Sequence, residues 1–188
     1  MVVTVRKKLF DKEGFAAAVY APGVISGNRA IWASIGAAIA MTNLAAATFL
    51  SGHPVVFVPP LAASAFIAFA VPRVRLARPK NIIGGHFIAA LAGNIILALL
   101  LGMNVSLGGA GITGWPRVAA VGLASFLGCL FMIIADMDHP PALATAVVVA
   151  VSYSAPNWWV PATFGAGAAI VSFWSIIWNR IFFDFPPR

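Results

Sequence analysis

Long apolar runs, separated only by short loops, are the feature that most constrains the fold of this chain. Of its 188 residues, 61% are hydrophobic and only 9% are charged, whereas an average soluble domain has about 25% charged residues. Several runs approach the roughly 20 residues that a helix needs to cross about 30 Å of hydrocarbon. The sequence therefore predicts an all-α polytopic membrane protein and argues against a soluble protein.

Six apolar segments can be delimited from the spacing of polar residues and prolines. They cover roughly residues 29–50, 55–71, 81–101, 115–135, 141–154 and 158–179. The second and fifth contain helices of only about 12 and 14 residues, or about 18 and 21 Å, which are too short to cross the bilayer alone. In an alternative with four spans these two segments lie outside the bilayer, which would expose apolar side chains to water at a considerable cost.

The distribution of Lys and Arg predicts the topology. Eleven of the twelve precede the first segment, separate the second from the third, or follow the sixth, and only Arg117 lies elsewhere. Because Lys and Arg gather in cytoplasmic loops, we expect both termini to be cytoplasmic in a bacterial inner membrane. The net charge of +7 then reflects topology and contact with membrane lipid, and no nucleic acid partner is expected.

The expected domain organisation follows from these segments. Residues 1–27 form an N-terminal cytoplasmic or interfacial segment, residues 28–181 form a single transmembrane domain, and residues 182–188 form a C-terminal tail. An internal repeat divides the transmembrane domain, because PPLAASA at 59–65 resembles PPALATA at 140–146.

The two copies of this repeat cover about 28–101 and about 115–181, with three segments each. An odd number of segments gives the copies opposite orientations, as in the inverted repeats of many transporters.

The prolines of the repeat predict how the two short segments begin. Proline suits the first turn of a helix, where its missing N–H has no partner to lose. Pro59-Pro60 and Pro140-Pro141 should therefore start short half-helices whose N-termini lie near mid-membrane. Helix N-termini bind anions through free backbone N–H groups and the helix dipole. The predicted anion-binding residues are Ala62, Ala63, Ser64, Leu143, Ala144 and Thr145. The alternative is that Pro-Pro only kinks a packed helix.

Ionisable residues in the apolar chain are further candidates, because such groups are costly at membrane depth. Asp136, Asp138 and His139 directly precede the second Pro-Pro pair, and His86 lies within the third segment. The aspartates either lie at membrane depth or lie among the cytoplasmic headgroups, where they could pair with Arg180 or with the basic 73–80 loop. His139 and His86 are candidate gates or proton carriers, or satisfied structural histidines. The pattern predicts no metal site and no cofactor.

The stretch DMDHPPALATA at 136–146 resembles the HPP family of small integral membrane proteins, which is named for this histidine and its two prolines. Three further stretches resemble the same family: PPLAASAFIAFAVP, ARPKNIIGGH and the closing WNR. Plastid and cyanobacterial relatives are associated with nitrite uptake, so the resemblance implies a small-anion transporter or channel. It also marks, as residues shared with the family, His139, Pro140, Pro141, Asn81, Gly84, Gly85 and His86.

Two departures from the usual family pattern accompany this resemblance. Family descriptions usually count four spans, whereas six segments are delimited here. The family also more often has glycine where this chain has Leu61 or Leu143, a change that could narrow the site or alter the ion that it takes.

The sequence thus predicts a membrane transporter, not an enzyme, for a small monovalent anion such as nitrite, and a homo-oligomer. The ion would bind between the two half-helix N-termini. A structural or regulatory membrane subunit is one rival. Others are an intramembrane enzyme in which Asp136, Asp138 and His139 converge, and a cation transporter that turns the two carboxylates toward the midplane.

Overall fold

The computed structural model describes residues 27–52 and 58–183, and every regular element in these ranges is helical. The predicted N-terminal segment and most of the predicted tail lie outside the described residues. The helices are α3 (Gly27–Leu50), α4 (Val58–Ala70), α5 (Pro79–Gly102), α6 (Trp115–Ile134), α7 (Leu143–Ser152) and α8 (Val160–Phe183). Two short 3₁₀ helices, η2 (Arg75–Ala77) and η3 (Pro140–Ala142), precede α5 and α7. The all-helical prediction is confirmed.

Helix lengths follow the order long, short, long in both halves of the chain. Helices α3, α4 and α5 have 24, 13 and 24 residues, and α6, α7 and α8 have 20, 10 and 24. Pro59 and Pro60 lie in the first turn of α4, and Pro140 and Pro141 begin η3, which leads directly into α7. The four long helices are long and apolar enough to span a membrane.

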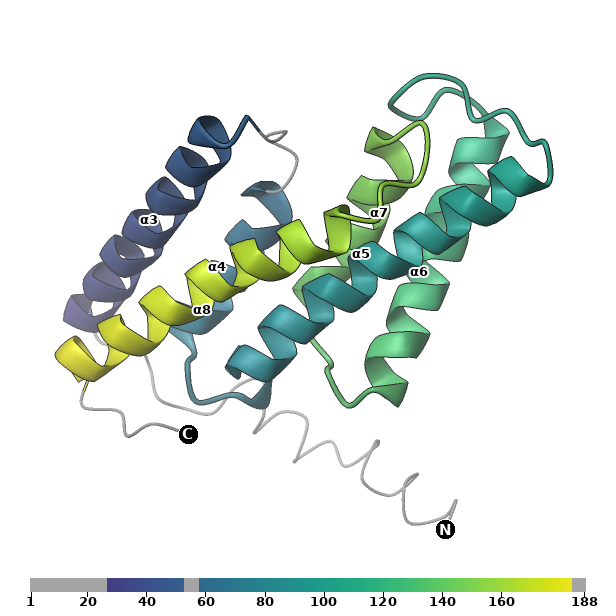
Figure 1. Cartoon of the computed structure of the whole chain (residues 1–188). Helices are drawn as coiled ribbons and strands as arrows, with labels where there is room; N and C mark the ends of the chain where they lie inside the picture. The colour runs from purple at the N-terminus through teal and green to yellow at the C-terminus, as the bar shows by residue number, and fades with distance from the viewer. Residues whose placement is uncertain (1–26, 53–57, 184–188) are drawn as a thin grey trace, which may run out of the picture.

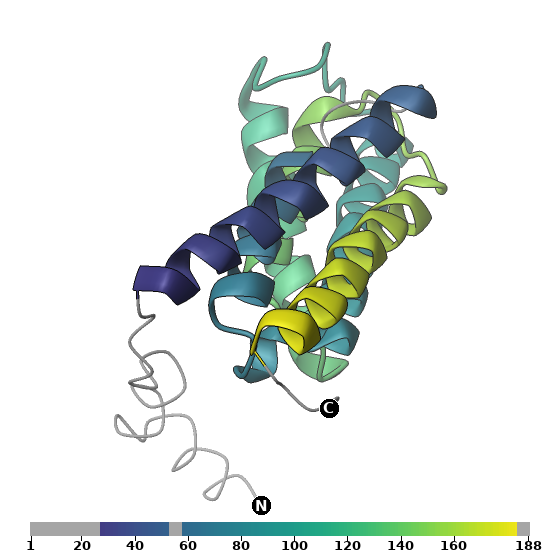
Figure 2. The ribbon, with the colours of Figure 1, turned by 90° about the vertical axis from the view of Figure 1, so that its left-hand side faces the viewer.

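Helix α5 is the centre of the bundle and packs against α6, α7 and α8, while α3 packs against α4 and α8 (Figure 1). Much of the core consists of alanine, including Ala89, Ala90 and Ala92 of α5. Small residues let helix backbones approach closely, which is the usual basis of helix packing in membranes. The start of α3 and the end of α8 lie toward the same side of the bundle (Figures 1 and 2).

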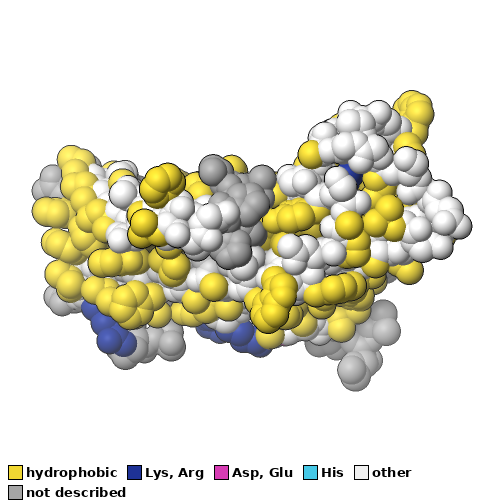
Figure 3. Space-filling view, turned by 45° about the horizontal axis from the view of Figure 1, so that its top comes forward, with side chains coloured by type: hydrophobic (Ala, Val, Ile, Leu, Met, Phe, Trp, Pro, Cys, Tyr) yellow, Lys and Arg dark blue, Asp and Glu magenta, His cyan; other side chains and the backbone are white. Residues whose placement is uncertain are grey.

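The outer surface of the bundle is largely apolar. Helices α3 and α6 are buried over only 28% of their spanning windows, whereas α5 is buried over 56% of its window. One face is covered mostly by apolar side chains, with Lys and Arg mainly along its lower edge (Figure 3). Such a surface suits contact with lipid chains, and the charged residues suit the level of the headgroups.

Candidate functional site

The linker between α6 and η3 is held in place by the way α6 ends. Asp136 has a left-handed backbone, with φ of 55°. The Asp136 N–H donates to the Ile133 carbonyl at 3.2 Å, and the Met137 N–H donates to the Met132 carbonyl at 3.0 Å. This pair of bonds is the Schellman arrangement that commonly ends helices. It turns the chain sharply toward α5, so that residues 137–139 run back along the start of α5.

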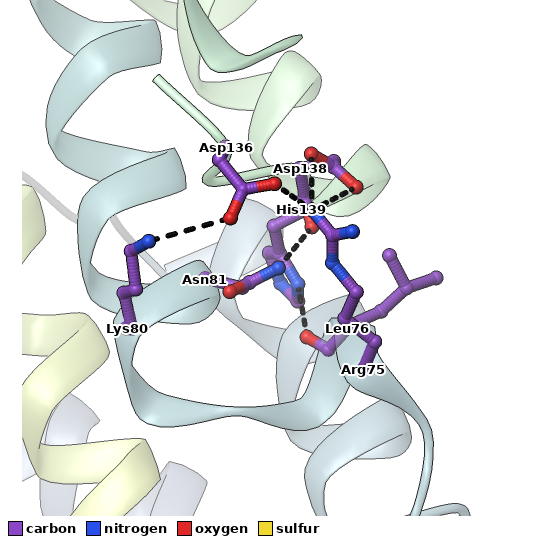
Figure 4. Close-up of polar contacts among 7 residues, drawn as sticks. All are labelled: Arg75, Leu76, Lys80, Asn81, Asp136, Asp138 and His139. Atoms are coloured by element: carbon purple, nitrogen blue, oxygen red, sulfur yellow. Dashed lines mark hydrogen bonds and ion pairs between the residues drawn. The ribbon is translucent and has the colours of Figure 1, made fainter. Parts of the chain in front are cut away.

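Two adjacent glycines of α5 let this linker lie directly on the helix. A Cβ atom at Gly84 would collide with Sδ of Met137, and one at Gly85 would lie 2.8 Å from Cβ of His139. Asn81, one turn earlier, donates from Nδ2 to the Asp138 carbonyl at 3.0 Å (Figure 4). The GG pair and Asn81 thus position His139 against α5, and the family resemblance had marked these same residues.

The carboxylates of the linker pair with basic side chains near the start of α5. Arg75 forms ion pairs with Asp136 and Asp138, and Nζ of Lys80 lies 3.5 Å from Oδ2 of Asp136 (Figure 4). These side chains are largely exposed. Of the two placements predicted for the aspartates, pairing with the 73–80 stretch is confirmed. The ring nitrogens of His139 bond the Ser64 hydroxyl and the Leu76 carbonyl, and not these carboxylates.

Replacing Asp136 by asparagine tests this exposed cluster, because asparagine also tolerates the left-handed backbone. The positive charge of Arg75, with a smaller effect of Lys80, lowers the pKa of Asp136. Because the pKa of Asp136 is lower in the fold than the ordinary value of about 3.9 for the unfolded chain, its ion pairs stabilise the fold fully at pH values above about 3.9. This stabilisation is lost as the pH falls through the lowered pKa. Thermal unfolding in detergent should show wild type slightly more stable at pH 7 and equal to the variant in strong acid. A difference that grew with acidity would contradict this account.

Four polar side chains meet in the interior of the bundle. Ser64 of α4, His86 of α5, Thr145 of α7 and His139 of the linker are all fully buried. Ser64 Oγ lies 2.7 Å from Nε2 of His86 and 2.7 Å from Nε2 of His139. Thr145 Oγ1 lies 2.7 Å from Nδ1 of His86. We call these four residues the buried polar chain.

The far end of the buried polar chain determines the direction of its hydrogen bonds. Nδ1 of His139 lies 2.8 Å from the Leu76 carbonyl, which can only accept, so Nδ1 of His139 carries a proton. With both rings uncharged, Nε2 of His139 accepts from the Ser64 hydroxyl. Ser64 has one proton and therefore accepts from Nε2–H of His86. Nδ1 of His86 then accepts from the Thr145 hydroxyl, so each donor in the chain points toward Leu76.

The structure separates the predicted anion contacts into two groups. Ser64 and Thr145 face the buried centre, whereas Ala62, Ala63 and Ala144 are exposed on the outside of the bundle and Leu143 is half-buried. At the start of the α7 segment, the backbone N–H groups of Ala142 and Leu143 already donate to backbone carbonyls. The Ala142 N–H donates to the His139 carbonyl at 2.8 Å, and the Leu143 N–H donates to Pro140 and Pro141 carbonyls. Donors toward a ligand at this point therefore come from side chains.

Arg117 is the buried residue whose role sequence reasoning missed. Its side chain is fully buried. Nε donates to Leu107, Nη1 to Ala150 and Tyr153, and Nη2 to Gly109, all backbone carbonyls, at 2.6–3.0 Å. Ala150 and Tyr153 lie at the C-terminal end of α7, where a cation is favoured by the helix dipole. Its signal in the sequence was its isolation from all other basic residues.

A pair of hydrogen bonds joins α5 to the segment before α8. Asn94 is fully buried and donates from Nδ2 to the Asn157 carbonyl at 2.9 Å, while the Asn157 N–H donates to Oδ1 of Asn94 at 3.0 Å. Further along α8, the ring of Phe164 stacks on His86, with centroids 6.3 Å apart and planes 3° apart. Helix α8 therefore covers one side of the buried polar chain.

Within residues 27–52 and 58–183, the structure contains no group of three or more His, Cys, Asp or Glu side chains that could hold a metal ion.

Comparison with known proteins gives a family but no activity. Two transmembrane proteins of Dictyostelium discoideum are similar to this chain, at 37% identity over 87 residues and 33% over 91 residues. These alignments cover 46% and 48% of this chain and 27% and 26% of the relatives, so the matched part spans about a quarter of their length.

No solved structure matches the chain significantly. A family model described as the transmembrane region of HPP proteins matches residues 22–185, which is most of the chain. Together with the four long apolar helices, this match identifies an integral membrane protein that belongs to the HPP transmembrane family.

Proposed function

We propose that this protein carries a small monovalent anion, with nitrite as the first candidate, across the membrane. The observation that supports the proposal most directly is the buried polar chain, in which hydroxyl and imidazole groups from three helices and a linker converge within an apolar bundle. Polar and ionisable groups at such a depth are costly and generally serve function.

The chemistry of these groups suits an anion better than a cation. The side chains of the buried polar chain are hydroxyls and imidazoles, which can donate hydrogen bonds, and carry no fixed negative charge. The carboxylates of Asp136 and Asp138 are exposed and paired with Arg75. A cation site would need carboxylates or free carbonyls in the interior. In this proposal Ser64 and Thr145 contact the ion, and His86 and His139 supply ring N–H donors or protons.

The helix starts contribute in a different way from the one that the sequence suggested. Pro140 and Pro141 carry no N–H, and the next two N–H groups are already bonded. The partial positive charge at the start of the α7 segment still favours an anion nearby. The direct hydrogen bonds to the ion would come from the Ser64 and Thr145 hydroxyls. We propose that the two halves act as inverted repeats, with the ion path between α4 and α7.

A non-transporting structural subunit is a second candidate, favoured by one specific observation. Every ring nitrogen and hydroxyl oxygen of the buried polar chain already has a partner within the protein. A buried network in which every polar group has a partner can have a purely structural role, in which it specifies how α4, α5 and α7 pack. The enzyme alternative has weaker support, because Asp136 and Asp138 bond Arg75 rather than His139.

Flux through reconstituted liposomes tests the proposal. The purified protein should pass nitrite in preference to chloride and nitrate, with formate measured alongside, at two pH values. Replacing Thr145 by leucine removes a hydrogen bond to the ion and adds bulk. Hydrogen bonds to charged groups contribute about 1.5–3 kcal/mol, so nitrite flux should fall at least about tenfold.

Ala166→Leu provides the matched control, because Ala166 of α8 is exposed on the outside of the bundle. This variant should keep the wild-type flux. Absence of flux for all four anions in well-folded wild type would overturn the transport proposal and favour the structural subunit. Equal losses in Thr145→Leu and Ala166→Leu would remove Thr145 from the ion path.

A further inference from the structure

We propose that the buried polar chain is a directional proton relay, which runs from Thr145 through His86 and Ser64 to His139. The inference rests on the proposed function, because the relay would carry protons beside the proposed anion path, with or without an anion present. The evidence is geometric. Three consecutive hydrogen bonds of 2.7 Å join the four side chains, and a fourth, of 2.8 Å, anchors His139 to the Leu76 carbonyl.

Proton transfer along such a chain needs each member both to donate and to accept, and these residues do. A hydroxyl holds one proton and can accept another, and an imidazole carries a proton on one nitrogen and a lone pair on the other. Because the Leu76 carbonyl only accepts, all donors of the uncharged chain point from Thr145 toward His139. A chain with this order can take a proton at Thr145 and deliver one at His139.

The transfer conserves protons at every step. When hydronium or the acid form of the anion gives a proton to Oγ1 of Thr145, the Thr145 hydroxyl proton moves to Nδ1 of His86. The Nε2–H proton of His86 moves to Ser64, and the Ser64 hydroxyl proton moves to Nε2 of His139. Each O–H or N–H bond that breaks is replaced by one formed on the next acceptor. The extra charge ends on His139 as an imidazolium, and the imidazolium bonds both Ser64 and Leu76.

The ring of His139 is fully buried, but the linker that carries it borders an exposed edge of the bundle, toward which the proton would leave. His139 directly follows Asp138, and the side chains of Asp136 and Asp138 are 71% and 40% exposed. The backbone on both sides of His139 is bonded. Asn81 donates to the Asp138 carbonyl (Figure 4), and the Ala142 N–H donates to the His139 carbonyl. Loss of this proton to water requires the bond between Nδ1 of His139 and the Leu76 carbonyl to open. The starting order returns only after both hydroxyls rotate and each ring exchanges its proton between Nδ1 and Nε2.

Most charged groups near the relay lie on the exit side, whereas Arg117 of α6 lies at the C-terminal end of α7 and bonds backbone carbonyls there. Helices α4 and α7 carry no Asp, Glu, Lys or Arg between Val58 and Ala70 or between Leu143 and Ser152. The other elements packed against the two rings carry Arg73, Arg75, Arg78, Lys80, Asp136, Asp138 and Arg180. Of these, Arg75, Lys80 and the two aspartates pair with one another at the exposed edge. The path between Thr145 and Ser64 therefore contains no fixed charge that would trap a proton.

The first test reads the tautomers directly and needs no transport assay. The chain has three histidines, so a His53→Gln variant labelled with nitrogen-15 at histidine leaves only His86 and His139. Nuclear magnetic resonance at neutral pH should show one ring protonated at Nε2, His86, and one at Nδ1, His139. Ser64→Ala should abolish the hydrogen-bond shift at Nε2 of both rings. Two rings of the same tautomer would overturn the proposed proton order.

The second test measures proton flux. Liposomes with wild-type protein and an internal pH dye, driven by a potassium diffusion potential, should take up protons, both without added anion and together with nitrite. Ser64→Ala should reduce proton uptake at least about tenfold, as expected for a proton-transfer group lost from a catalysed path. Thr145→Val removes the hydroxyl and should lose the proton uptake, whereas Thr145→Ser keeps the hydroxyl and should retain more of the uptake than Thr145→Val. Ser172→Ala removes a buried hydroxyl outside the relay and should behave as wild type.

The outcomes separate the relay from the transport proposal. Proton uptake that depends on Ser64, without any nitrite flux, would keep the relay and overturn nitrite as the substrate. Nitrite flux with no accompanying proton movement, or proton uptake unchanged in Ser64→Ala, would overturn the relay and leave anion transport in place. Thermal unfolding of each variant in detergent shows whether a lost flux comes from a lost fold.

Discussion

Replacing Arg117 by leucine is expected to destabilise the protein by about 3–5 kcal/mol, the range seen when one member of a buried charged contact is removed. Arg117 donates four hydrogen bonds to backbone carbonyls and is fully buried. Leucine supplies no donor, so the carbonyls of Ala150, Tyr153 and Gly109 would lose these bonds, and the Leu107 carbonyl would keep only its bond from the Thr113 hydroxyl. An unpaired carbonyl costs about 1–3 kcal/mol where it is buried. Thermal or denaturant unfolding in detergent micelles measures the loss.

The same unfolding measurement should show whether Arg117 acts through the several donors of its planar guanidinium or only through its positive charge. Lysine in place of Arg117 keeps the charge and offers fewer, less rigid donors, so it should recover only part of the stability. Arg180→Leu, at the exposed end of α8, removes a charge from the surface and should change the free energy of unfolding by less than about 0.5 kcal/mol. Equal effects of Arg117→Leu and Arg180→Leu would contradict the structural role of Arg117.

Gly85→Ala should also have a large effect, because it acts where the linker crosses α5. The added methyl group would lie 2.8 Å from Cβ of His139 and 3.3 Å from the Met137 carbonyl oxygen. Neither neighbour is the end of a flexible side chain, so the linker must move away from the helix. Overpacking of this kind costs about 1–3 kcal/mol. It should also lengthen the bond between His139 and Ser64, and thus reduce the proposed transport as well as the stability.

Gly122→Ala on α6 is the matched control, since no atom lies within 4 Å of an added Cβ there. Alanine is a better helix former than glycine by about 0.5–1 kcal/mol, so this variant should be slightly more stable than wild type with unchanged flux. Unfolding in detergent and nitrite flux in liposomes are measured on both variants. A Gly85→Ala protein as stable and as active as Gly122→Ala would show that the linker does not need the close approach.

Most of the fold could be predicted from the sequence, because membrane helices are specified by local properties. Long apolar runs predict spans, and prolines mark where α4 and η3 begin, so the predicted segments match the helices to within a few residues. The main uncertainty concerned Asp136 and Asp138, for which pairing with Arg180 or the 73–80 loop and placement at membrane depth fitted the sequence equally well. A charge pattern does not tell which of several distant partners a side chain will meet.

The candidate site was predictable only in part. Ser64, Thr145, His86 and His139 were each singled out, but the sequence placed the backbone N–H groups of Ala62 and Ala144 beside them. In the structure both alanines are exposed, since residues two positions from Ser64, or one position from Thr145, point to another face of a helix. The roles assigned to these residues stay predictions until flux is measured.

The sequence by itself determined that this chain is a helical membrane protein of the HPP family with two short Pro-Pro helices. These properties depend on hydropathy and on residue type at single positions. The tertiary structure alone decided that His139 contacts Ser64 across 75 positions of the chain, and that Arg117 binds carbonyls at the end of α7. Those contacts depend on how helices cross and where Gly84 and Gly85 let the backbone approach, which is a property of packing and not of any single segment.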